Sequence, residues 1–325
     1  MNRLFALLCL AALLIGCDKK QAAAPRPSVP AEKVSLALNW FPEAEHGGYY
    51  AALVHGIYAE EGLDVTIIPG GPDVPVAPRV ATGQVEFGVA NADQVVFARA
   101  ARANVVALMA PLQTSPRCIM VHDGTSYKSF ADLNDMTLAL GMQDAFAQFL
   151  KKNYPLRNVK IVPYPGSVAT FLNDKSFGQQ AYNISEPFLA AKGGAKPRVL
   201  MLSDAGWNPY TSVLLTADSL LGERRDMARR FVRASVRGWD KYMKEPTETN
   251  ARINQLNGEM GVDILKFGVD EMQAMVYTPE TRDKGTGAMT PERWTTLIRQ
   301  MEALELVQPF LVKPEECFTS ALLVP

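Results

Sequence analysis

Side chains suited to holding a flat, nitrogen-containing ring are concentrated at two places in the sequence. Asn39 and Trp40 stand together, and His46 and Tyr49 follow within ten positions. Glu186 lies in the second half of the chain, and a carboxyl group pairs well with the N–C–N edge of an amidine-like ring. An anionic ligand would instead require arginine or bare amides. Glu186 therefore favours a neutral or cationic heterocycle, unless it only caps the helix that follows it.

Further candidates follow predicted strands, at the sheet edge where open α/β folds bind ligands. Gly70 lets the backbone approach a ligand closely, and Asn91 offers an amide or caps the next helix. Tyr49 and its neighbour Tyr50 diverge on a helix, so at most one of them faces a site. The predicted ligand-binding residues are Asn39, Trp40, His46, Tyr49, Gly70, Asn91, Tyr164, Glu186 and Tyr210.

Motifs for several other kinds of chemistry are missing from the sequence. It contains no His-x-x-Glu-His or Cys-x-x-Cys zinc motif and no Gly-x-Ser-x-Gly nucleophile motif. The formal net charge is -1, with acidic and basic residues interspersed rather than gathered in a basic stripe. We therefore predict no catalytic residue, no metal, no cofactor and no nucleic-acid partner.

The elements that would position these residues alternate between strand and helix. This rhythm predicts parallel α/β sheets. The C-terminal third is helical, with one long amphipathic helix over 220–243 and another that begins at Thr290. The predicted strands are 34–40, 63–69, 86–90, 105–110, 118–122, 137–141, 159–163, 181–184, 199–202 and 211–216.

Two proline-containing segments, 111–116 and 204–210, are predicted to cross between two lobes. Lobe 1 would comprise 34–116 and 211–325, and lobe 2 would comprise 117–210. Two crossings beside a closable cleft form the hinge architecture of type II periplasmic binding proteins. The predicted fold is therefore α/β, with two lobes, two crossover segments and a ligand cleft between them.

The N-terminus predicts secretion and a lipid anchor. Arg3 precedes an apolar run that is too short to span a bilayer of roughly 30 Å, and the run ends in Leu14-Ile15-Gly16-Cys17, which resembles a bacterial lipobox. We predict a signal peptide over 1–17, lipidation at Cys17 and a disordered tether over 18–33. The protein would be held on the periplasmic side of a membrane, inner or outer. A plain signal peptide is the alternative, and pairing of Cys118 with Cys317 is left open.

The opening of the body carries a family resemblance. The residues Asn39-Trp40-Phe41-Pro42, the stretch that begins at His46, the pair Gly70-Gly71 and the turn Ser185-Glu186-Pro187 resemble the thiamine pyrimidine-precursor binding proteins. More loosely, they resemble riboflavin, sulfonate and nitrate binding proteins. This resemblance implies a monomeric solute-binding lipoprotein that serves an ABC permease and ATPase, with Glu186 contacting an aminopyrimidine.

Four alternatives remain beside the favoured ligands, hydroxymethylpyrimidine and formylaminopyrimidine. The same cleft would accept riboflavin or another fused ring, and sulfonate or nitrate binding occurs on the same fold. A fungal pyrimidine synthase-like enzyme is disfavoured because those enzymes carry a cysteine-rich iron motif, whereas only Cys118 and Cys317 follow the lipobox. A sensing lipoprotein would differ from an importer subunit only in its partners.

Overall fold

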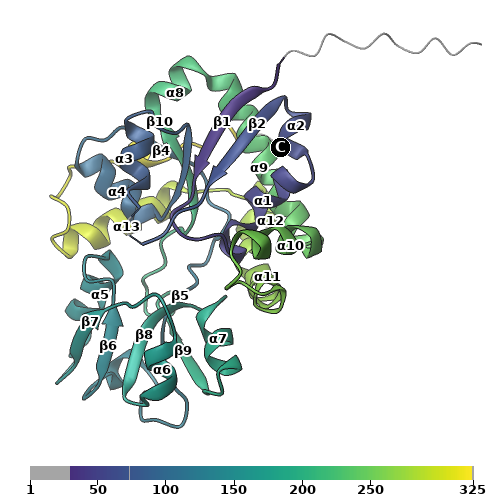
Figure 1. Ribbon diagram of the computed structural model, residues 1–325. Helices are drawn as coiled ribbons and strands as arrows, with labels where there is room; N and C mark the ends of the chain where they lie inside the picture. The colour runs from purple at the N-terminus through teal and green to yellow at the C-terminus, as the bar shows by residue number, and fades with distance from the viewer. Residues whose placement is uncertain (1–29, 73, 324–325) are drawn as a thin grey trace, which may run out of the picture. The chain divides into compact units, whose positions relative to one another are not determined.

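The structure is a computed structural model that describes residues 30–72 and 74–323 (Figure 1). The predicted signal peptide, Cys17 and most of the predicted tether lie outside the described residues. The chain from Ala31 onward forms one compact unit. Throughout the described ranges, no helix has both the length and the apolar character needed to cross a membrane.

The first sheet has the strand order β2-β1-β3-β10-β4. β1 runs parallel to β2 and β3, whereas β10 is antiparallel to both of its neighbours, β3 and β4. The strands are β1 (Glu32–Ala37), β2 (Leu63–Ile68), β3 (Phe87–Ala90), β4 (Val105–Met109) and β10 (Val213–Ala217). β1 begins inside the predicted tether because Glu32 accepts hydrogen bonds from Arg224 and Arg230.

The second sheet repeats this arrangement with the order β7-β6-β8-β5-β9. β6 is parallel to β7 and β8, and β5 is antiparallel to β8 and β9. The strands are β5 (Arg117–His122), β6 (Thr137–Leu140), β7 (Lys160–Pro163), β8 (Phe177–Tyr182) and β9 (Pro197–Met201). β8 starts four residues before the predicted strand. The prediction began too late because two buried glutamines, Gln179 and Gln180, interrupt the apolar pattern of the strand.

The expectation of wholly parallel sheets is therefore wrong for one strand in each sheet. β5 and β10 are the first strands after the chain passes from one sheet to the other. Each enters its sheet from the side where the remaining strands end, so it runs in the opposite direction. The carboxyl ends of the remaining strands consequently meet on the facing edges of the two sheets.

We call the first sheet and the helices packed on it lobe 1, and the second sheet with its helices lobe 2 (Figure 1). Lobe 1 contains η1 (Ala44–His46), α1 (Gly47–Val54), α2 (Ile57–Glu60), α3 (Val76–Ala81), α4 (Ala92–Ala100), α8 (Asp218–Glu223), α9 (Arg225–Lys244), α10 (Thr247–Leu256), α11 (Val262–Val276), α12 (Pro279–Lys284), α13 (Pro291–Ala303) and α14 (Pro314–Cys317). Lobe 2 contains η2 (Phe130–Asp132), α5 (Ala145–Asn153), α6 (Ala169–Asn173) and α7 (Glu186–Lys192).

The helix predicted over 220–243 is divided in two at Arg224. This residue leaves helical geometry, with φ -131° and ψ 39°, and its guanidinium donates to Glu32 at 2.8 Å and to Glu86 at 3.1 Å. The ion pairs tie the break to β1 and to the loop before β3. The helical pattern of the sequence continues through the break because Leu220 and Leu221 of α8, which are partly buried, pack against the same core as the buried side chains of α9.

The core of lobe 1 is built where α9 crosses α1 and the sheet. Phe231 of α9 stacks on Phe87 of β3 with ring centroids 4.0 Å apart and on Tyr58 of α2 at 5.0 Å. Cys317 is buried in lobe 1 and Cys118 is buried in β5 of lobe 2, and both cysteines are free. The pairing that the sequence left open is therefore not formed.

Candidate functional site

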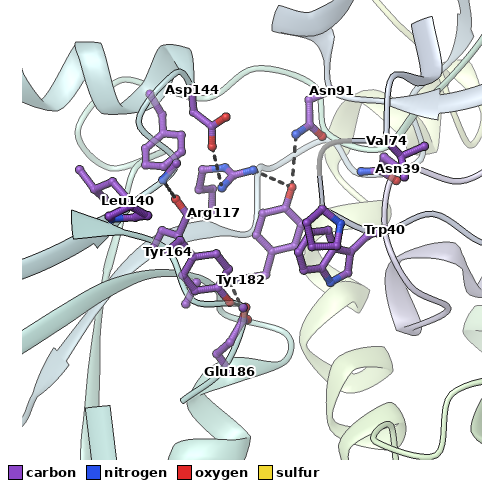
Figure 2. A pocket seen from close by; sticks show the side chains of 18 of the residues that line it. Asn39, Trp40, Val74, Asn91, Arg117, Leu140, Asp144, Tyr164, Tyr182 and Glu186 are labelled. Atoms are coloured by element: carbon purple, nitrogen blue, oxygen red, sulfur yellow. Dashed lines mark hydrogen bonds and ion pairs between the residues drawn. The ribbon is translucent and has the colours of Figure 1, made fainter. Parts of the chain in front are cut away.

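A cavity of about 510 Å³ lies at the facing edges of the two sheets (Figure 2). Residues that follow β1 and β3 and residues that end β6, β7 and β8 contribute to its wall, together with the starts of α4, α5 and α7. Its lining comprises Asn39, Trp40, Glu43, Glu45, Gly71, Pro72, Val74, Asn91, Asp93, Gln94, Arg117, Leu140, Gly141, Met142, Asp144, Phe146, Pro163, Tyr164, Pro165, Gly166, Gln180, Ala181, Tyr182 and Glu186. We call this cavity the cleft.

Five of the nine predicted binding residues line the cleft: Asn39, Trp40, Asn91, Tyr164 and Glu186. Each follows directly or closely after a strand, where the sequence placed it. Asn91 does more than precede α4, because its Oδ1 accepts from the Ser212 backbone N–H at 3.2 Å and its Nδ2 donates to the Tyr182 hydroxyl at 3.4 Å. Contact of these side chains with a ligand remains a prediction.

His46 and Tyr49 do not line the cleft, and their predicted positions need correction. His46 is fully buried, and its Nε2 lies 2.9 Å from Asn39 Oδ1 and 3.2 Å from Glu45 Oε1. It therefore positions two cleft residues from behind. Tyr49 points into the lobe 1 core, where its ring makes an edge contact with Trp239 at 5.9 Å, because α9 covers that face of α1.

Gly70 and Tyr210 also lie outside the lining. A Cβ at Gly70 would stand 2.2 Å from the Leu38 carbonyl oxygen, so glycine is required for close passage of the chain past the end of β1 rather than for a ligand. Tyr210 is buried in lobe 1. Its ring lies under the Arg293 guanidinium at 3.9 Å, and its hydroxyl accepts from the Thr290 backbone N–H at 3.0 Å.

Sequence reasoning missed much of the charge in the cleft, namely Glu43, Glu45, Asp144 and the cleft-facing roles of Asp93 and Arg117. The signal was present for two of them, since Glu43 and Glu45 stand in the loop directly after Trp40. The other three approach from α4, β5 and the start of α5, and only the folded chain brings them together.

Arg117 is already held by protein groups. Its Nη2 donates to the Tyr182 hydroxyl at 3.2 Å, its Nη1 lies 4.0 Å from Asp144 Oδ2, and the guanidinium lies over the Phe146 ring at 4.6 Å (Figure 2). Burial alone would lower the pKa of Arg117, but the surrounding oxygens of Tyr182, Asp144, Asp93 and Glu45 raise it overall. The guanidinium thus stays charged, and nearby acidic side chains of the cleft balance its positive charge.

Glu186 is fixed by three donors. Tyr164 donates its hydroxyl to Oε1 at 2.7 Å, and the Tyr182 backbone N–H and the Ser185 hydroxyl donate to Oε2 at 2.9 and 2.6 Å. Burial, followed by the adjacent Glu186 charge, raises the pKa of Tyr164 and keeps its proton in this bond. Glu186 therefore holds the end of β8 and the loop after β7 around the cleft.

Asp93 makes stability depend on pH. Burial, followed by the Asp144 charge, raises its pKa from 3.8 to about 6, although Arg117 opposes the shift. Between these two values the native state binds more protons than the unfolded state, so the free energy of unfolding falls as pH rises, and the loss is complete above pH 6. Asp93→Asn is expected to remove a destabilisation of about 1–2 kcal/mol at pH 8, because the side chain is only partly buried.

Urea unfolding at pH 4 to 8 measures this effect. The gain in stability of Asp93→Asn over wild type should be small at pH 4 and should level off above pH 6. Asp64→Asn is the matched control, since Asp64 is exposed on β2 and far from the cleft. Parallel curves for wild type and Asp93→Asn would show that Asp93 keeps an ordinary pKa.

Two α/β lobes with a cleft at their facing strand ends define the fold of periplasmic binding proteins. The periplasmic aliphatic sulphonate binding protein SsuA from Escherichia coli has this fold. It superposes with a TM-score of 0.66 and 14% identity, over 88% of this chain and 91% of SsuA. The predicted fold class is thereby confirmed.

The chain belongs to the NMT1/THI5-like family, whose model matches residues 43–249. Riboflavin-binding protein RibY of Chloroflexus aurantiacus is 25% identical, over 92% of this chain and 88% of RibY. A formylaminopyrimidine-binding protein of Halalkalibacterium halodurans is 24% identical, over 89% of this chain and 90% of that protein. The resemblance predicted from the opening motif is confirmed.

Proposed function

We propose that this chain is the solute-binding subunit of an ABC-type importer and that it captures a flat, nitrogen-rich heterocycle in the cleft. The periplasmic-binding-protein fold and the two relatives named as binding proteins support the general role. A pyrimidine precursor of thiamine is the leading ligand. The proposed partners are the permease and the ATPase of the importer, with the subunit acting as a monomer.

The excess of carboxyl groups in the cleft carries the ligand proposal. Among the described residues, five acidic side chains line it, those of Glu43, Glu45, Asp93, Asp144 and Glu186, against the single cation of Arg117. Because Arg117 is paired with Tyr182 and Asp144, it leaves no positive charge for a sulfonate or nitrate. Carboxyl oxygens instead suit a ligand rich in N–H donors.

Aromatic side chains give the cleft the walls that a flat ring requires. Trp40 comes from lobe 1, and Phe146, Tyr164 and Tyr182 come from lobe 2. A ring that stacks on Trp40 would gain its polar contacts from lobe 2 only when the lobes approach each other. Ligand contacts that exist only in the closed form would shift the population toward it.

Riboflavin is the second candidate, and the similarity to RibY favours it. The cavity volume of about 510 Å³ lies within the range of roughly 300–1,000 Å³ typical of small-molecule sites, so volume alone does not choose between one ring and three.

A thermal-shift panel on the purified protein tests the proposed ligand class. The panel contains hydroxymethylpyrimidine, its formylamino derivative, thiamine, riboflavin, taurine and nitrate. We expect a shift with one or more of the heterocycles and none with taurine or nitrate. A shift with taurine or nitrate alone would contradict the proposal.

We further propose that lipidation of Cys17 anchors the protein on the periplasmic side of the membrane. Cys17→Ser is expected to move the protein from the membrane fraction to the soluble periplasmic fraction, because one thioether carries the diacylglyceryl group. Immunoblotting of the fractions measures this, with Cys118→Ser as control because Cys118 is buried in β5. Membrane retention of Cys17→Ser would overturn the anchor.

A further inference from the structure

Glu43 is a buried acid without a partner. It precedes η1, the residue is 7% exposed, and its carboxyl group receives no side-chain or backbone hydrogen bond from the described part of the chain. It lines the cleft and also a small apolar hollow formed with Met260, Ile264 and Leu265. A polar group that no protein atom pairs with costs free energy on burial unless water or a ligand pairs with it, and the cleft is where Glu43 can meet either.

The two neighbouring acids, Glu45 and Glu186, differ from Glu43 in the hydrogen bonds that their carboxyl groups receive. Glu186 receives three hydrogen bonds, and Glu45 accepts one from the Ser212 hydroxyl at 3.2 Å and contacts the His46 ring. Donated hydrogen bonds stabilise a carboxylate. Glu43 receives none from the described residues, so no donor stabilises its carboxylate form.

Within the described part of the chain, the charges that act on Glu43 are negative, and no cation is among them. Glu45 from η1 and Glu186 from α7 face it, together with the hydroxyls of Tyr164 after β7 and Tyr242 of α9. The α11 side contributes apolar side chains. Burial, followed by the charges of Glu45 and Glu186, raises the pKa of Glu43 well above its usual value.

We propose that Glu43 binds the ligand as a neutral carboxylic acid and so selects a ring edge that presents one donor beside one acceptor. The acid O–H donates to the acceptor of the ring, and the acid carbonyl oxygen accepts from the neighbouring N–H. A neutral aminopyrimidine has such an edge. A cationic amidinium has two donors and requires a carboxylate. This inference rests on the proposed heterocycle site. It names Glu43 as the residue that distinguishes a neutral ring edge from a cationic one within that site.

Infrared difference spectroscopy tests the neutral acid without any ligand. Wild type minus Glu43→Gln at pH 7 should contain the C=O stretch of one protonated carboxylic acid. Glu271→Gln, which alters an exposed residue of α11, should contain only the bands of a carboxylate. A carboxylate difference for Glu43→Gln would overturn the proposal whether or not the ligand is known.

Calorimetric titration with hydroxymethylpyrimidine from pH 7 to 9, where an aminopyrimidine stays neutral, tests the recognition. Glutamine offers the same acceptor and donor as a protonated acid. We therefore expect Glu43→Gln to stay within about threefold of wild type at pH 7, whereas Glu43→Ala should lose about tenfold or more. Wild-type affinity should fall as pH rises and Glu43 ionises, and the affinity of Glu43→Gln should not.

The outcomes separate this inference from the proposed function. A tenfold loss in Glu43→Gln, equal to that in Glu43→Ala, would mean that Glu43 binds as a carboxylate, and it would overturn the inference while the heterocycle site stands. If hydroxymethylpyrimidine fails to bind wild type, the proposed pyrimidine ligand falls, and the infrared difference still decides the protonation of Glu43. Circular dichroism of each variant confirms that it is folded.

Discussion

Replacing Gly238 with alanine is expected to lower the free energy of unfolding by about 3 kcal/mol, because α9 crosses α1 with no room for a side chain. A Cβ at Gly238 would stand 2.3 Å from the Gly48 carbonyl oxygen and 2.7 Å from the Ala52 Cβ. Both groups belong to the rigid body of α1, so the two helices must separate. Gly47 and Gly48 face Tyr242 and Trp239 across the same crossing.

Gly222 provides the matched control for this change. It lies in α8, and a Cβ there would meet nothing within 4 Å. Alanine favours a helix over glycine by up to about 1 kcal/mol, so Gly222→Ala should be neutral or stabilising. Urea unfolding of the two variants should therefore show effects of opposite sign. Equal stabilities of Gly238→Ala and wild type would mean that α1 and α9 are not packed this closely.

The same crossing links stability to the site. η1 leads directly into α1 and carries Glu45 and His46, so displacement of α1 would move the group that holds Asn39. We therefore expect Gly238→Ala to weaken ligand binding although Gly238 lies outside the cleft. A stability loss without any change in affinity would show that η1 keeps its position independently of α1.

Local patterns were enough to predict most elements of the fold, because most strands are short apolar runs bounded by turn residues. The direction of β5 and β10 was not predictable in this way. It depends on the side from which the chain enters a sheet after crossing, and no local pattern records that. β8 was placed late because Gln179 and Gln180 are buried within it, and polar residues in a strand centre hide its periodicity.

The site follows the same division between local and long-range information. Asn39, Asn91 and Tyr164 were placed in the cleft because strand ends gather at a sheet edge whatever the remaining contacts are. Tyr49 was misplaced because its direction depends on α9, nearly two hundred residues later in the chain. The acid excess was missed because it forms only when η1, α4, α5 and α7 meet.

Trp40→Ala is expected to weaken heterocycle binding by about 10- to 100-fold, since stacking of a flat base on an aromatic side chain contributes about 1–3 kcal/mol. Trp40 is half-buried at the end of β1 and supplies the lobe 1 aromatic surface of the cleft. Trp40→Phe should recover part of the loss, because a smaller ring still stacks. Calorimetric titration with the ligand found in the panel measures each affinity.

Intrinsic fluorescence gives an independent reading of the same contact. The chain has four tryptophans, all within its described part, and Trp207, Trp239 and Trp294 are buried in the core, each at most 1% exposed. A ligand that stacks on Trp40 should change the emission of wild type and leave that of Trp40→Ala unchanged. Phe41→Ala is the control, since Phe41 is 47% exposed and touches the edge of Trp40 from outside the cleft lining. If Trp40→Ala binds within twofold of wild type, the ring stacks elsewhere, and the lobe 2 aromatics Phe146, Tyr164 and Tyr182 must form the platform on their own.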